Sequence, residues 1–184
     1  MNRALHRILG RAVVTTTVTL GLVAAGVGTS VADASQARDG KGATRVAVAP
    51  RVVKVITGAG ITASPTGNAQ AFPFKGTVAF RFPITGASPD GNRINHSGGV
   101  KLAKGHAKIT LSYFRINLRR GYVSAVVNGD ARASVFNLAE SGRPALGPVR
   151  LTFNRTSASA INQTFGVHAF AAGQSFGYAR VNPA

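Results

Sequence analysis

The chain has 184 residues and a formal net charge of +17, with 22 Lys and Arg against five Asp and Glu. It has no cysteine, which excludes thiol catalysis, cysteine-held iron–sulfur clusters and thiolate zinc sites. A surface this cationic attracts polyanions of every kind, including nucleic acid, acidic glycans and lipid head groups, in a salt-dependent way.

The first 34 residues have the pattern of a secretory signal peptide. Three arginines form a positive segment, the apolar stretch Ala12–Val27 follows, and residues 32–34 (Ala-Asp-Ala) fit an A-x-A cleavage site. The apolar stretch is shorter than the ~20 residues that span a bilayer, so we expect cleavage and no retained transmembrane anchor. Cleavage would remove three Arg and one Asp and leave a secreted or cell-wall-associated protein of net charge +15. Residues 35–43 then predict a flexible leader, and residues 44–184 a single β-rich domain.

The first part of this domain predicts strands and a loop. Arg45–Thr57 contains two β-branched runs interrupted by Pro50, which predicts two short strands or an edge strand. Gly58–Gln70 is rich in Gly, Ser, Thr and Pro and predicts a loop. Ala71–Thr85 places its phenylalanines and aliphatic residues on even positions, which predicts one long half-buried strand.

The longest period-two pattern is in Gly98–Val127. Apolar and polar residues alternate from Ile109, and the parity switches at Tyr113–Phe114. A slip of one residue would move every following apolar side chain to the wrong face, so the switch predicts a β-bulge there. Asn128-Gly129 then predicts a tight hairpin turn, because both residues accept positive φ.

The C-terminal part predicts one helix, Ser157–Phe165, capped by Thr156 or Ser157 and ended by Gly166. The other segments predict short strands: Tyr122–Val127, Ala131–Leu138, Val149–Asn154 and Phe176–Val181. Together these elements predict an all-β fold, an antiparallel β-sandwich or open barrel with one short C-terminal helix.

No catalytic set can be assembled from these residues. Gly173–Gly177 matches the G-x-S-x-G motif of certain hydrolases, but no Asp, Glu or His follows Ser175, as the triad of those enzymes requires. Only four acids lie outside the signal peptide, and Asp90 and Asp130 stand in turn contexts where Asp bonds local backbone. We therefore expect that the protein is not an enzyme.

The histidines outside the signal peptide are His96, His106 and His168, and no pair has metal-binding helical spacing. His106 shares the polar strand face with Lys108, where a histidine is either a solvated residue or a ligand-binding group.

A stripe of basic residues could accompany His106, with two tyrosines that add stacking surface. Lys and Arg also keep ordinary sheet edges soluble. Export argues against nucleic acid as the physiological partner. The residues are Lys101, Lys104, Lys108, Arg115 and Arg119, with Tyr113 and Tyr122.

Several motifs follow one another in a recognisable order. A phenylalanine-rich strand precedes a glycine-led strand, a Gly-His pair, an alternating strand and a glycine turn into a strand of small and valine residues. These are Phe74–Ile84, Gly99–Leu102, Gly105-His106, Ile109–Ile116 and Gly121–Val127. The order resembles the HtaA-like domain of exported actinobacterial proteins, a β-rich module associated with haem capture at the cell surface. The resemblance covers about residues 55–183.

The resemblance implies haem transport, with His106 at the position of a histidine of the family's haem pocket. The family's opening segment carries a tryptophan and an axial tyrosine. This chain has no tryptophan, and Ile56–Gln70 has no tyrosine, so no axial ligand to haem iron is identified. Lys and Arg side chains could still pair with the porphyrin propionates.

The sequence thus predicts an exported, non-enzymatic binding protein, with haem or another porphyrin as candidate ligand on a basic sheet face. The candidate ligand-binding residues are His106, Lys108, Tyr113 and Arg115. The alternative is a structural or adhesive cell-envelope protein that binds anionic polymers through charge alone. Salt distinguishes the two, because binding through charge weakens steeply as ionic strength rises.

Overall fold

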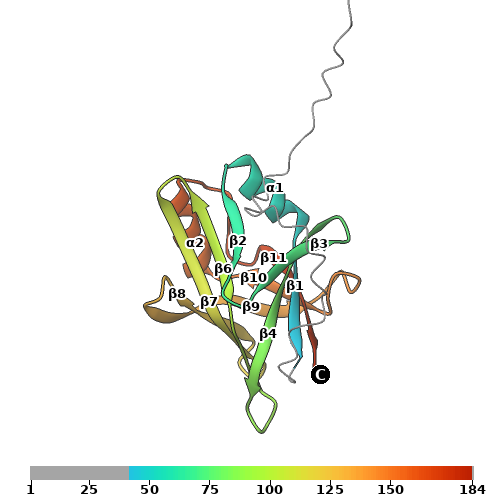
Figure 1. Ribbon diagram of the computed structural model, residues 1–184. Coiled ribbons are helices and arrows are strands. Elements are labelled where there is room, and N and C mark those ends of the chain that lie inside the picture. The colour runs from blue at the N-terminus through green and yellow to red at the C-terminus, as the bar shows by residue number, and fades with distance from the viewer. Residues whose placement is uncertain (1–41, 184) are drawn as a thin grey trace, which may run out of the picture.

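The computed structural model describes residues 42–183, which form strands and two helices around one hydrophobic core (Figure 1). The predicted signal peptide (residues 1–34) and all but the last two residues of the predicted leader (residues 35–43) lie outside the described residues. In chain order the elements are β1 (Ala43–Val48), α1 (Pro50–Gly58), β2 (Thr62–Thr66), β3 (Gln70–Phe74), β4 (Thr77–Ala87), β5 (Arg93–His96), β6 (Gly99–Lys104), β7 (Ala107–Asn117), β8 (Tyr122–Val127), β9 (Ala131–Glu140), β10 (Val149–Phe153), α2 (Arg155–Phe165) and β11 (Ser175–Asn182).

Eight of these strands close into an antiparallel barrel. The strand order is β7-β5-β4-β1-β11-β10-β9-β8, and β8 pairs back with β7. The short β5 joins the C-terminal halves of β4 and β7. The N-terminal halves of the same two strands pair instead with β3 and β6, and β2 extends the sheet beyond β6. The predicted all-β antiparallel fold with a short C-terminal helix is therefore confirmed, and the layout is a barrel.

The C-terminal helix α2 packs against β7 and β9 (Figure 1). The side chain of Asn154 caps it by accepting a hydrogen bond from the backbone N–H of Ser157 at 2.8 Å. The sequence places the cap at Thr156 or Ser157, so the helix begins earlier than predicted. Gly166, at φ 62°, ends it as predicted. Neither helix of residues 42–183 is long and apolar enough to cross a membrane.

The second half of Arg45–Thr57 is the helix α1, and the prediction of a strand there is wrong. Pro50 is a first-turn residue of this helix. Proline suits that position because its φ is preset and the first N–H groups of a helix have no intrahelical partner. Val52 is buried and α1 packs against β2 and β4, so tertiary packing overrides the β-propensity of the branched residues. The predicted loop Gly58–Gln70 also contains β2.

The predicted single strand Ala71–Thr85 is instead the hairpin of β3 and β4. Lys75 and Gly76 form its turn, with φ of 45° and 74°. Phe74 pairs with Thr77, and directly opposed residues of an antiparallel pair face the same side. The turn therefore places the phenylalanines of β3 on the opposite face of the sheet from Phe80, which is buried in the core.

The bulge predicted in β7 is confirmed. Ser112 pairs with Val126 and Arg115 with Ser124, so Tyr113 and Phe114 together oppose one residue of β8. Tyr113 has φ 50°, an uncommon value for a residue other than glycine. The predicted turn at Asn128-Gly129 is also confirmed, because both residues have positive φ.

At Gly99, β6 lies so close to β7 that the backbone leaves no room for a side chain. A Cβ at this position would lie 2.3 Å from the carbonyl oxygen of Leu111. We expect Gly99→Ala to lower the free energy of unfolding by about 2 kcal/mol, because the backbone has to shift. Denaturant titration measures this as a lower midpoint at an unchanged m-value. Gly86→Ala, whose Cβ would meet nothing within 4 Å, is the control, and equal losses in both variants would contradict this expectation.

Candidate functional site

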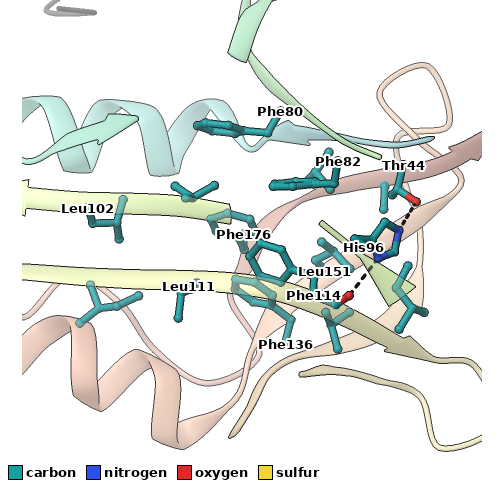
Figure 2. A pocket seen from close by; sticks show the side chains of 16 residues that line it. Thr44, Phe80, Phe82, His96, Leu102, Leu111, Phe114, Phe136, Leu151 and Phe176 are labelled. Carbon is teal, nitrogen blue, oxygen red and sulfur yellow. Dashed lines mark hydrogen bonds between the residues drawn. The ribbon is translucent and has the colours of Figure 1, made fainter. Parts of the chain in front are cut away.

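The barrel interior contains a cavity of about 60 Å³, lined by strand residues and by Ile161 of α2. Its lining is apolar except at one end, where His96 and Thr44 lie (Figure 2). Pockets for small-molecule ligands measure roughly 300–1,000 Å³, so a porphyrin does not fit inside the barrel. The largest lining side chains are Phe80, Phe82, Phe114, Phe136 and Phe176.

His96 is a buried imidazole that is hydrogen-bonded on both nitrogens. Nδ1 lies 3.1 Å from the carbonyl oxygen of Phe114, and Nε2 lies 2.8 Å from Oγ1 of Thr44 (Figure 2). A carbonyl can only accept, so Nδ1 carries the proton, and in the neutral ring Nε2 accepts from the threonine hydroxyl. Burial lowers the pKa of His96, and the hydrogen bond to Phe114 opposes this only in part. His96 therefore joins β5 to β1 and β7 as a neutral ring.

A second concave region lies on the outside of the barrel, where β5, β7, β8 and β9 meet, and we call it the arginine hollow. It measures about 710 Å³, within the usual range of ligand pockets. Five arginines and a single acid line it, so its charge is strongly positive. The lining residues are Arg93, Arg115, Arg119, Arg120 and Arg132, with Asp90, Asn92, Asn117, Tyr122, Ser124 and Ala133.

Two of these arginines are held in place by hydrogen bonds to other strands. Nε of Arg115 donates to Oδ1 of Asn95 at 2.8 Å. A terminal nitrogen of Arg132 donates to the carbonyl oxygen of Tyr113 at 2.9 Å and to Oγ of Ser124 at 3.3 Å. Burial, followed by the positive charge of Arg115, lowers the pKa of Arg132. Each guanidinium has five N–H donors, so these bonds orient the side chains without using their full donor capacity.

Asp90 is the single acid of the hollow, and its oxygens are bound within its own turn. They accept from Oγ of Ser88, from the backbone N–H of Asn92 at 3.1 Å and from Nδ2 of Asn92 at 2.9 Å. Hydrogen bonds from Ser88 and then Asn92 lower the pKa of Asp90 to about 2, with a smaller contribution from Arg93. The carboxylate stays ionised, but one carboxylate offsets only part of the charge of five guanidiniums.

The structure does not bring the four predicted ligand-binding residues to one place. His106 lies in the exposed β6–β7 turn, and Lys108 is exposed near the start of β7. Tyr113 is 59% exposed at the bulge, and Arg115 lies in the arginine hollow. At about 3.3 Å per strand residue, His106 and Arg115 are separated by roughly 25–30 Å along β7. Of the predicted basic stripe, Arg115 and Arg119 line the hollow and the three lysines do not.

Several residues of the two cavities are absent from the sequence-based prediction. Arg93, Arg120 and Arg132 reach the hollow from β5, from the β7–β8 turn and from β9, and only strand register shows that they converge. His96 gives no local signal of burial in the sequence. In residues 42–183 no three His, Asp or Glu side chains lie where they could together hold a metal ion.

No family model matches the chain, and no curated protein matches it in sequence. Among solved structures the chain is similar to the heme binding protein HtaB from Corynebacterium glutamicum, with a TM-score of 0.49 and 8% sequence identity. The match covers 78% of this chain and 92% of that chain. Similarity at this level says nothing about a ligand.

The buried neutral His96 makes the stability of the barrel sensitive to acid. The unfolded chain takes up a proton at the ordinary pKa of 6.5, whereas burial holds the pKa lower in the folded state. Between these two values the unfolded state binds more protons, so the free energy of unfolding falls as the pH decreases from 6.5. We expect His96→Gln to flatten this dependence, because an amide does not titrate in this pH range.

Denaturant titrations between about pH 5 and pH 7.5 measure this effect, since the unfolded chain takes up the His96 proton within this range. His106→Gln is the control, because that side chain is exposed and its variant should retain the wild-type slope. The same slope in wild type and His96→Gln would show that another group causes the acid sensitivity.

Proposed function

We propose that this chain is a non-enzymatic binding protein that takes an anionic ligand in the arginine hollow. The observation that carries the proposal is the set of five guanidiniums around a hollow of about 710 Å³ that contains one carboxylate. Arginine cannot give up its proton in a protein, so it binds anions and is a poor general acid or base. The composition of the hollow supports binding over catalysis.

Carboxylate and phosphate groups suit this hollow because a guanidinium can bind either of them with two parallel hydrogen bonds. Asn95 and the Tyr113 carbonyl hold Arg115 and Arg132 in position. A ligand therefore meets donors that are already oriented, which lowers the entropy lost on binding. Arg119 and Arg120 line the hollow from the exposed β7–β8 turn, where a ligand can reach them.

Haem or another porphyrin is the candidate ligand of this class, bound through its two propionates. The guanidiniums of the hollow suit the two propionates, and Tyr122 adds an aromatic face and a phenol oxygen. A tyrosine oxygen is a known ligand of ferric haem, so Tyr122 is the residue of the hollow that would hold the iron. Arg115 is the one predicted ligand-binding residue that belongs to this proposed site. Binding would take place outside the cytoplasm, in keeping with the secretory pattern of residues 1–34.

The test is a haemin titration of the purified protein, followed by the Soret band. We expect wild type to shift the band, and Arg119→Gln/Arg120→Gln to bind about tenfold more weakly or worse, because charged hydrogen bonds are lost. Both side chains are exposed, so the fold should be unaffected. The matched control is Arg51→Gln/Lys54→Gln on α1, which removes the same charge from exposed positions elsewhere.

Two further measurements separate the parts of this proposal. The dimethyl ester of the porphyrin should bind poorly, since it lacks the carboxylates. The absence of any Soret change with haemin would exclude the porphyrin. Calorimetry with pyrophosphate then tests anion binding itself, and equal affinity of wild type and Arg119→Gln/Arg120→Gln would exclude the arginine hollow as the site.

A further inference from the structure

Three arginines lie directly opposite one another on neighbouring strands at another part of the barrel. Arg45 of β1 pairs with Arg81 of β4 on one side and with Arg180 of β11 on the other. Thr44 and Val46, which flank Arg45, line the interior cavity, so Arg45 faces outward. Neighbouring strands are about 4.8 Å apart, and the three positions therefore form a line of roughly 10 Å across the strands. We call Arg81, Arg45 and Arg180 the arginine row.

The positive charges of the row are close together. Like charges at directly opposed positions destabilise a sheet. Burial, followed by the charge of Arg180, lowers the pKa of Arg45. The guanidinium carbon of Arg45 lies 3.9 Å from the centre of the Phe74 ring, a cation–π contact that fixes its position.

Two arginines at this surface have a nitrogen that the protein leaves without an acceptor. Nε of Arg45 is buried and has no hydrogen-bond partner, and the same holds for Nε of Arg150 on β10. Arg150 pairs with Tyr178, two residues along β11 from Arg180. Buried donors normally have partners, so these two Nε–H groups are exceptions within the protein.

The row and the arginine hollow lie on opposite sides of the barrel. Around the closed sheet, the hollow takes its residues from β5, β7, β8 and β9, whereas the row takes its residues from β4, β1 and β11. Figure 1 shows β8 and β1 well separated across the molecule. One compact ligand cannot occupy both sites.

We infer that the arginine row is a second anion-binding site, which takes a linear phosphate polymer laid across β4, β1 and β11. A single small anion reaches one or two guanidiniums, whereas a ligand whose charges recur along a line reaches all three. The arginine row runs across the strands, so the bound polymer runs across the strands as well. The inference uses none of the residues of the proposed function.

The test is binding of inorganic polyphosphate to the purified protein at several salt concentrations. The slope of log affinity against log salt reports the number of phosphate contacts. We expect Arg81→Gln/Arg180→Gln to reduce the steepness of this slope by about two, one for each lost contact. Arg180→Gln alone, at an exposed position, should reduce it by about one, which covers the case in which the double variant folds poorly.

The control Arg51→Gln/Lys54→Gln removes the same net charge and should leave the slope unchanged. An equal drop in this control, or a wild-type slope in Arg81→Gln/Arg180→Gln and in Arg180→Gln, would overturn the inference. Arg119→Gln/Arg120→Gln separates the two sites. If that variant retains wild-type pyrophosphate affinity, the proposed function is wrong. Polyphosphate binding at the arginine row is then still tested by Arg81→Gln/Arg180→Gln and Arg180→Gln.

Discussion

The bulge at Tyr113 in β7 is the constraint on which the rest of the structure depends. It inserts one residue, and this allows β7 to face the core with Ile109 before the bulge and with Phe114 after it. The same residue turns Arg115 outward into the arginine hollow. Without it the second half of the strand would bury its polar residues and expose its apolar ones.

The bulge also supplies backbone groups that connect the interior to the surface. The carbonyl of Tyr113 accepts from Arg132, and the carbonyl of the next residue, Phe114, accepts from His96. The β-bulge in β7 therefore orients the guanidinium of Arg132 on the outside of the barrel and the imidazole of His96 on its inside. Local strain at Tyr113 is sustained by these contacts on both faces of the sheet.

The arginines of this barrel are clustered, and such clustering does not favour folding. Clustered guanidiniums repel one another, and their repulsion lowers the stability of the folded chain. An anion that binds only the folded state would offset this loss by mass action. The apolar cavity inside the barrel, at about 60 Å³, has neither the volume nor the charge for such a ligand. A bound anion would therefore lie on the outer surface of the barrel.

Local chemistry predicts part of this fold, and long-range register decides the rest. The bulge at Tyr113 and the turn at Asn128-Gly129 follow from parity and from residues that accept positive φ. The helix at Pro50 escapes prediction because proline is compatible both with a strand break and with a helix start. The hairpin at Lys75-Gly76 is not predicted because the phenylalanines stand on even positions both before and after its turn. Arg132 joins Arg115 only through the pairing of β7, β8 and β9, which no local pattern encodes.

The central claim is that the arginine hollow binds anions, and NMR of arginine Nε–Hε groups tests it most directly. Pyrophosphate is added to the purified protein while each arginine signal is followed. If the hollow is the site, the signals of its arginines shift together and saturate, while those of Arg51 and Arg155 on the helices stay in place. Shifts of equal size at all arginines, or shifts that exclude Arg115 and Arg132, would contradict the claim.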